Sequence, residues 1–293
     1  MSETLRAGII GCGQVSRVAH APALQWDGRA KITAIADPDE ENRRYLKKQF
    51  GRPSDYADYQ EMLDKEDLDI VIIASPPWLH AQHFLDCCDK DVHILCEKPL
   101  ATTMEDCHRM VNRVKTHDKI VQIAHTKRFE IGFGKIKEWV QKQKLGQIYQ
   151  ISVYWHYYIP DFRKGWLKTA LGTLKNLGMD LEKKYGVWRY FDDRAGGGDF
   201  FDHGPHYIDL MRFMFGELET VYCKTGHFLE NRVYEDLAIA TFTLSNGALF
   251  VIEKGNLAMG RPTGFERGYV YAEKAKIFFE ATQEYQKKAL KVD

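Results

Sequence analysis

The chain has 293 residues, enough for two domains that each bury a core. Hydrophobic residues make up 44% and charged residues 28%, which is typical of a globular protein. The 41 basic and 41 acidic residues balance, which argues against a general attraction to nucleic acid or an anionic membrane, and no apolar run has the length of a membrane span. No signal peptide is recognisable, and the six cysteines lack metal-ligand spacing, so we expect a cytoplasmic protein with reduced thiols.

The first part of the chain, residues 1–125, alternates strand-like and helix-like segments. The expected strands are Ala7–Ile10, Lys31–Ala36, Asp69–Ala74, Val92–Cys96 and Lys119–Ala124. The expected helices are a stretch ending at Leu24 and the segments Asp39–Phe50, Trp78–Cys88 and Met104–Thr116. The near-continuous apolar run of the third strand is typical of a strand buried on both faces. This alternation predicts a doubly wound parallel sheet of the Rossmann type.

The pattern changes in residues 126–293. Helices are expected at Phe129–Gln143 and Phe200–Phe215, and strands at Gln147–Trp155, Thr220–Thr225, Leu237–Leu244, Ala248–Lys254 and Gly268–Ala272. Strands that follow one another without helices between them predict an α+β domain whose open sheet is predominantly antiparallel and covered on one face. The stretch 156–195 is long and rich in aromatic residues. It is either a lid over a sugar substrate or a segment packed on its own domain or on a partner.

A glycine-rich turn follows the first expected strand directly. Gly11 would allow a tight turn, Gly13 would let a pyrophosphate approach the backbone, and the small Ser16 would let the next helix pack closely. Gln14 and Val15 begin that helix, whose N-terminal N–H groups attract phosphate. The turn therefore predicts a dinucleotide-binding site.

An acidic residue ends the second expected strand. Asp37 lies where a carboxylate commonly binds the ribose hydroxyls of a dinucleotide. Because a carboxylate there repels the 2′-phosphate of NADP, we expect NAD, with NADP less favoured. Arg43 and Arg44 in the next helix could bind such a phosphate, but a solvated helix face explains them more simply.

A more specific motif, Cys96-Glu97-Lys98-Pro99, follows the fourth expected strand. Together with the GCGQVS turn and the segment SPPWLHAQH at 75–83, it resembles the Gfo/Idh/MocA family, which includes glucose–fructose oxidoreductase and dehydrogenases of inositols and sugars. The similarity continues in chain order through Lys127–Phe129, Leu145–Ile148, Gly196–Asp209 and Val270–Ala275. Family members usually have a further helix and strand after the region matching Tyr271–Phe279, so we expect this C-terminus to be short for the family.

The resemblance implies roles for individual residues. Lys98 would contact the cofactor ribose and the substrate hydroxyl, and His206 would be the general acid/base, a task that suits the near-neutral pKa of histidine. Asp202 would bind substrate or orient His206 from one helical turn away; the alternative is a helix-start acid. Glu97 would fix the nicotinamide side. The other residues of the cofactor groove would be Ser75, Pro76 and His80. No metal is implied.

These roles describe a dehydrogenase that transfers a hydride between NAD and a secondary alcohol of a sugar, cyclitol or glycoside. Two alternatives use the same residues: a glycoside hydrolase or lyase that oxidises its substrate transiently, and a cofactor-binding subunit without activity. The expected partners are a small polyol or sugar and further copies of the chain, joined through the C-terminal sheet.

Several polar residues keep two interpretations. His203 either belongs to the site or points to solvent, and Asp209 either belongs to the site or pairs with Arg212. Three cationic residues could contact a phosphate or carboxylate of the substrate or could be solvated; these are Arg163, Lys164 and Arg194.

Overall fold

The computed structural model describes residues 4–157, 173, 192–229, 232–256, 265–282 and 288–292. The chain divides into two compact units. Most of the first unit is Met1–Ala124, and most of the second is the chain from His125 onward; Arg194–Gly196 belongs to the first unit. The expected 156–195 stretch lies almost entirely outside the described residues.

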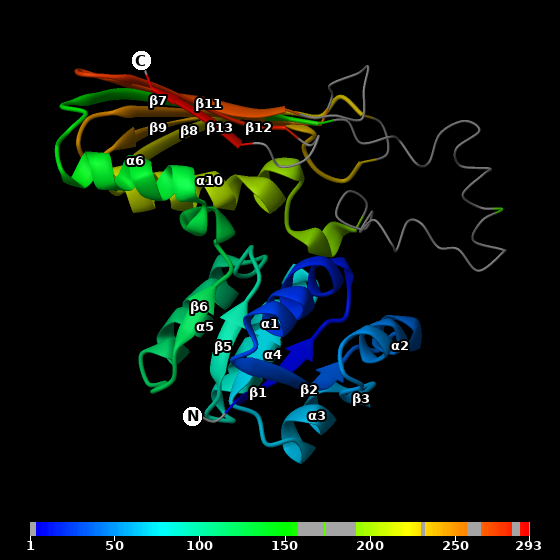
Figure 1. The fold of residues 1–293 in the computed structure, drawn as a ribbon. Helices are drawn as coiled ribbons and strands as arrows, with labels where there is room; N and C mark the ends of the chain where they lie inside the picture. The colour runs from blue at the N-terminus through cyan, green and yellow to red at the C-terminus, as the bar shows by residue number, and fades with distance from the viewer. Residues whose placement is uncertain are drawn as a thin grey trace. The chain divides into compact units, whose positions relative to one another are not determined.

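The first unit is built on a six-stranded parallel sheet with the strand order β3-β2-β1-β4-β5-β6 (Figure 1). Its strands are β1 (Leu5–Ile10), β2 (Ala30–Ala36), β3 (Ser54–Tyr56), β4 (Ile70–Ile73), β5 (His93–Cys96) and β6 (Val121–Ile123). Its helices are the π-helical turn η1 (Ser16–His20), α1 (Ala21–Asp27), α2 (Glu40–Gln49), α3 (Tyr59–Lys65), α4 (Pro77–Cys88) and α5 (Met104–Val114). The doubly wound parallel sheet is therefore confirmed.

Helices cover both faces of this sheet. Ala21 of α1 and Leu46 of α2 pack in one apolar cluster with β1 and β2, whereas α3, α4 and α5 supply the cluster on the other face. Side-chain caps fix where several helices begin: Asp39 accepts a hydrogen bond from the Asn42 N–H, and Thr103 accepts one from the Asp106 N–H. The helices therefore start where short polar residues precede them.

The second unit is built on a seven-stranded sheet with the order β13-β12-β11-β7-β10-β9-β8. Its strands are β7 (Ile148–His156), β8 (Leu218–Gly226), β9 (Leu237–Leu244), β10 (Leu249–Gly255), β11 (Phe265–Ala272), β12 (Lys276–Thr282) and β13 (Lys288–Val292). Only the β7–β10 pair among these is parallel. The helical segments are η2 (Thr126–Phe129), α6 (Ile131–Gln141) and α10 (Asp199–Phe215). The short η3 (Asp193–Ala195) precedes α10 in the chain, and two of its three residues belong to the first unit. The predominantly antiparallel sheet is therefore confirmed.

Two helices cover one face of this second sheet. In Figure 1, α6 and α10 lie along the same face. Ile136 of α6 and Tyr207 and Leu210 of α10 are fully buried in one cluster with the inward-facing residues of the strands. The alternation of buried and exposed residues along β9 follows from this one-sided cover. The arrangement places one side of α10 against the sheet.

Candidate functional site

The turn after β1 requires glycine at its first position. Gly11 has a φ of 94°, and a Cβ at this position would lie 2.6 Å from the backbone carbonyl of Ala74. A Cβ on Gly13 would meet no atom within 4 Å, so this side of the turn is open. The buried Ser16 hydroxyl donates to the Gly11 carbonyl at 2.6 Å and closes the turn onto the helix. This geometry fits the close approach of a pyrophosphate to Gly13.

The helix after this turn begins with a π-helical turn. Val15 precedes it, and η1 then accommodates one residue more than an α-helical turn would. His20 ends this turn and is buried against the Glu97 carboxylate, with Nε2 at 2.8 Å from Oε1. Gln14 is exposed at the rim of the turn. The sequence analysis missed His20, whose only signal is a single histidine in the first helix.

Asp37 ends β2 beside the glycine turn. Its carboxylate accepts hydrogen bonds from the Cys12 N–H at 2.7 Å and from the Asp39 N–H at 2.8 Å. The Asn42 amide also donates to it, at 3.3 Å. The carboxylate is thereby held at the glycine turn, where a ribose hydroxyl of a dinucleotide would be bound.

Three arginines lie in the helical segments that follow β1 and β2. Arg43 is only 13% exposed at its side chain, donates to the Asp37 carbonyl at 2.5 Å and pairs with Asp55, so its interpretation as part of a solvated face is wrong. Arg44 is exposed and pairs with Glu40, as a solvated face requires. Arg17 donates to the Cys12 carbonyl at 3.0 Å. Arg43 is thus bound to a backbone carbonyl at the end of β2, and Arg17 is bound to one in the glycine turn.

The loop after β4 carries Ser75 and Pro76. The Ser75 hydroxyl lies 2.9 Å from His83 Nδ1, and Pro76 precedes the first turn of α4. His80 is 1% exposed, and its two ring nitrogens lie 2.8 Å from the carbonyl oxygens of Ser75 and Pro99. Burial lowers the pKa of His80, which favours the neutral ring. His80 therefore connects two loops and can affect a cofactor groove only through them.

Glu97 and Lys98 follow β5, and the Lys98–Pro99 peptide is cis. The Glu97 carboxylate accepts from its neighbour's N–H, that of Lys98, at 3.1 Å and contacts His20. Burial raises the pKa of Glu97, but the hydrogen bond and charge of His20 and the charge of Lys98 outweigh it, so the pKa lies below its ordinary value. The acid is thus held ionised at the end of the strand.

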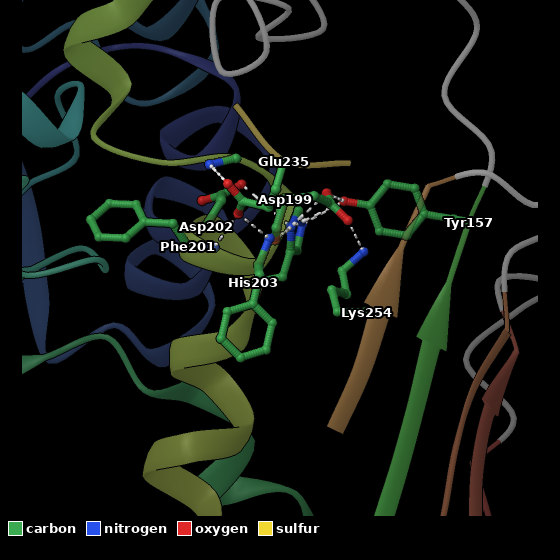
Figure 2. Close-up of polar contacts among 9 residues, drawn as sticks. Tyr157, Asp199, Phe201, Asp202, His203, Glu235 and Lys254 are labelled. Atoms are coloured by element: carbon green, nitrogen blue, oxygen red, sulfur yellow. Dashed lines mark hydrogen bonds and ion pairs between the residues drawn. The ribbon is translucent and has the colours of Figure 1, made fainter. Parts of the chain in front are cut away.

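In the second unit, Glu235 caps the N-terminus of α10 (Figure 2). Its carboxylate accepts hydrogen bonds from the Gly198 N–H at 2.9 Å and the Phe200 N–H at 3.1 Å. These N–H groups would otherwise form an anion site. The cap therefore occupies the helix N-terminus with a carboxylate of the chain itself.

A buried ion pair lies beside this cap. The Lys254 ammonium on β10 contacts the Asp199 carboxylate on α10, and the two side chains are 0% and 1% exposed. The Tyr157 hydroxyl donates to Asp199 Oδ1 at 2.8 Å, and the ammonium lies 3.7 Å from the centre of the Tyr157 ring. Burial raises the pKa of Asp199, but the hydrogen bonds and charges of His203 and Lys254 outweigh this effect. The pKa therefore lies well below its ordinary value, and the carboxylate is ionised. The sequence analysis did not identify these three residues.

His203 lies between two carboxylates instead of pointing to solvent. Its Nδ1 is 3.3 Å from Asp199 Oδ1 and 3.6 Å from Asp202 Oδ2, and its side chain is 20% exposed. The Trp155 ring packs against the rings of His203 and His206, with centroid distances of 4.9 and 6.2 Å. The structure therefore brings Asp202, His203 and His206 together on α10.

The other polar residues that had two interpretations do not contact the Asp199–Lys254 pair in the described residues. Asp209 pairs with Arg128 at 2.6 Å, whereas Arg212 pairs with Glu217. The interpretation that Asp209 pairs with Arg212, one of the two left open, is therefore wrong. The Arg194 guanidinium lies 4.6 Å above the Trp78 ring within the first unit. Arg163 and Lys164 lie outside the described residues, as do most of the aromatic residues of that stretch.

The described residues contain neither a cluster of metal ligands nor a helix that could span a membrane. Within the ranges given above, no group of three or more His, Cys, Asp or Glu side chains could hold a metal ion. In the same ranges, the helices are too short or too polar to cross a membrane.

Comparison with known proteins identifies both halves of the chain. Residues 5–125 match the NAD-binding Rossmann-fold model of the GFO_IDH_MocA oxidoreductase family, and residues 133–278 match the GFO/IDH/MocA C-terminal domain. The chain is 26% identical to myo-inositol 2-dehydrogenase of Thermotoga maritima over 96% of this chain and 76% of that protein. It is 27% identical to D-glucoside 3-dehydrogenase of Escherichia coli over 73% of this chain and 55% of that protein.

Solved structures share the fold. The WlbA dehydrogenase of Bordetella pertussis, in complex with NADH and UDP-GlcNAcA, aligns with a TM-score of 0.80 at 22% identity. The alignment covers 97% of this chain and 82% of that one. At this identity the likeness concerns the fold alone.

Proposed function

Because this chain belongs to the Gfo/Idh/MocA family of oxidoreductases, we propose that it is an NAD-dependent dehydrogenase of a polyol. It transfers a hydride between nicotinamide and the carbon of a secondary alcohol in a sugar, cyclitol or glycoside. The observation that carries this proposal is the glycine turn, which is open at Gly13 and lies directly beside the Asp37 carboxylate. Both features suit the pyrophosphate and ribose of a dinucleotide.

The proposed cofactor contacts follow from the first unit. The backbone at Gly11–Val15 would hold the pyrophosphate, Asp37 the adenine-side ribose, and Glu97 and Lys98 the nicotinamide side. When bound, NAD accepts the hydride, and the protein supplies orientation and charge. NAD is preferred because Asp37 would repel a 2′-phosphate, while Arg17 is already bound to a backbone carbonyl. Fluorescence titration with NADH and NADPH tests this preference. The substitution Asp37→Asn should reduce the ratio of the affinity for NADH to that for NADPH.

The proposed chemistry assigns one proton and one charge. His206 takes the proton of the reacting hydroxyl, since a neutral imidazole is a suitable base near neutral pH. The Lys98 ammonium stabilises the negative charge that develops on the alcohol oxygen. Asp202, one turn before His206 on α10, orients the imidazole or the substrate.

We propose that copies of the chain associate through the sheet of the second unit. The face opposite α6 and α10 carries exposed apolar side chains on β8, β9 and β10, which are neighbours, and on β11 beyond β7; these are Tyr222, Ile239, Leu249 and Tyr271. Such patches commonly mark interfaces. Light scattering of the wild type and of the double variant Tyr222→Lys/Leu249→Lys tests this proposal. The variant should have a smaller particle mass than the wild type, and equal masses of the two proteins would contradict the proposal.

The first test of the activity follows the absorbance of reduced nicotinamide while NAD and then NADP are offered with inositols, sugars and methyl glycosides. Reduction of NAD by one polyol class is the expected result. Two outcomes would contradict the dehydrogenase proposal. In one, a polyol is consumed without net reduction of NAD; in the other, NAD binds but no polyol reacts.

A further inference from the structure

Three side chains form a row across the middle of the second sheet. Trp155 on β7 is paired directly with Lys254 on β10 and with Glu266 on β11. Directly paired residues of a sheet share one face. Ile151 and Val153 lie at alternate positions of the same strand as Trp155 and are fully buried. The row therefore faces the helices that cover this sheet.

Each charged residue of this row is paired with an opposite charge from a helical segment. Lys254 contacts Asp199 on α10, and Glu266 contacts Lys127 on η2. The two lysine side chains are 0% and 9% exposed. Both ammonium nitrogens lie over the Trp155 ring, each 5.2 Å from its centre, a distance at which a cation is attracted to the face of an indole. Two buried ion pairs therefore flank the indole and leave it little room to turn.

The same indole packs against one face of α10. Three ring centres of this helix lie 4.9 to 6.2 Å from the centre of the Trp155 ring; they belong to His203, His206 and Tyr207. Residues three and four apart share one face of a helix, so these rings lie on the side of α10 that faces the sheet. A ring held in place limits the orientations of the rings that pack against it. Trp155 thus bounds the His206 imidazole from the sheet side.

The orientation of this imidazole decides whether it can serve as the proposed base. A base must bring its nitrogen within hydrogen-bond reach of the hydroxyl whose proton it takes. A displacement of about 1 Å can slow such a step about 100-fold. A side chain that holds a base in place must itself be fixed by its surroundings. Trp155 meets this requirement, because buried ion pairs and two neighbouring strands flank its ring.

We propose that Trp155 is a positioning residue: held between the Lys127–Glu266 and Lys254–Asp199 pairs, it fixes the orientation of the His206 imidazole. This inference rests on the proposed function and adds a residue that acts through the proposed base. Trp155 itself exchanges neither proton nor hydride. It follows that its loss should slow the proton transfer and leave the binding of polyol and cofactor unchanged. A residue that served only the core would affect stability alone, and a substrate contact would affect KM.

The kinetic test compares Trp155→Leu and Trp155→Phe with the wild type, using NAD with myo-inositol and with methyl β-D-glucopyranoside. Trp155→Leu should lower kcat about 10- to 100-fold, because the base is no longer held at the reacting hydroxyl. The KM for the polyol and the affinity for NADH should stay as in the wild type. The solvent deuterium isotope effect on kcat should increase, since proton transfer is the step that slows. Trp155→Phe keeps a ring and should lie between the leucine variant and the wild type.

The matched control is Trp139→Leu on α6. Trp139 also packs against the core of the second unit, and the Lys135 ammonium lies 6.0 Å from its ring centre. The control therefore removes an indole with a cation over it from another helix of the same unit. It should lower the unfolding temperature without changing kcat or the isotope effect of the folded protein.

A second measurement does not depend on turnover. In protein labelled with ¹³C at histidine, nuclear magnetic resonance gives the order parameter of the His206 ring C–H bond on the ps–ns timescale, and His206→Gln assigns the signal. The order parameter should fall in Trp155→Leu and keep its wild-type value in Trp139→Leu. If the leucine variant at 155 does not fold, Trp155→Phe decides by the same measurement, and an order parameter equal to that of the wild type overturns the inference.

The possible outcomes separate this inference from the proposed function. An unchanged order parameter in Trp155→Leu, or an unchanged isotope effect on its turnover, would overturn the positioning role. A raised KM with an unchanged kcat would also overturn it, because Trp155 would then be a substrate contact. Failure of the wild type to reduce NAD with any polyol would instead contradict the proposed function, and the order parameter of His206 would still decide whether Trp155 positions that ring.

Discussion

Replacing Lys254 with methionine would leave the Asp199 carboxylate buried without its cation. Both side chains are inaccessible to solvent, and the ammonium contacts the carboxylate directly. Removing one partner of a buried ion pair costs about 3–5 kcal/mol, because the remaining charge has neither water nor a counter-ion. Tyr157 and His203 still contact Asp199, so we expect the lower end of that range, about 3 kcal/mol. For a unit of this size, the unfolding temperature should fall by about 6–12 °C.

The assay is thermal unfolding followed by tryptophan fluorescence, since Trp155 packs beside Lys254. The matched control is Asp199→Asn/Lys254→Met, in which the asparagine oxygen still accepts the hydrogen bond of Tyr157 but carries no charge. We expect this double variant to recover most of the lost stability, because replacing a whole buried pair is often nearly neutral. A double variant as unstable as Lys254→Met alone would refute the role assigned to the uncompensated charge.

The same comparison has a definite pH dependence. In the wild type, the pKa of Asp199 is held below its ordinary value, so the carboxylate stabilises the fold above about pH 3.9 and this contribution is lost as the pH falls further. In Lys254→Met, burial raises that pKa instead, so the variant is destabilised at neutral pH and regains stability as the pH falls through the raised value. The difference between the two proteins should therefore be largest near pH 7 and narrow below about pH 5. A difference that stays constant from neutral to acid pH would contradict this assignment.

Three further predictions concern the proposed chemistry. Lys98→Ala and His206→Ala should each abolish turnover and leave NADH binding intact in a fluorescence titration; wild-type rates in both would refute the mechanism. Gly13→Ala should weaken NADH binding about tenfold or more without lowering the unfolding temperature, because the added methyl meets only the open side of the turn; unchanged affinity would exclude the proposed pyrophosphate position. His20→Ala should raise the pKa of Glu97, so any loss of activity on acidification should begin at higher pH; an unshifted acid limb would show that Glu97 ionisation does not matter.

Much of the fold could be predicted because its strands carry strong apolar patterns. The run that became β4 is apolar throughout and lies in the centre of the first sheet, and β9 alternates as a one-sided strand should. Two edge strands that were not predicted lack such patterns, whereas β12 (KIFFEAT) was not predicted although it is apolar. β3 is a three-residue strand at one sheet edge, and the five-residue β13 at the edge of the other sheet contains two lysines, Lys288 and Lys291. Edge strands need little burial, so periodicity does not reveal them.

The candidate site divides in the same way between local and long-range signals. The glycine turn and the Asp202–His206 spacing are local, and the sequence analysis identified them directly. Tyr157, directly after β7, and Lys254 on β10 both reach Asp199, although they are 97 residues apart in the chain (254 − 157). Their pairing exists only because β7 and β10 are neighbours in the sheet and α10 packs beside them. A lysine or tyrosine at a strand end has no pattern of its own that would predict this contact.

The buried charges beneath α10 have a consequence for the orientation of their neighbours. An ion pair in this position is weak evidence for stability, since a well-packed apolar pair would do as well. It does, however, hold the Asp199 oxygens in one place, and those oxygens fix the Tyr157 hydroxyl and His203 Nδ1. An apolar replacement would leave both groups free to turn. We therefore infer that the pair is retained for orientation: it holds the Tyr157 hydroxyl and the His203 ring in one place next to the proposed base. A variant with a neutral, apolar pair at 199 and 254 should then be stable yet turn over its polyol more slowly than the wild type.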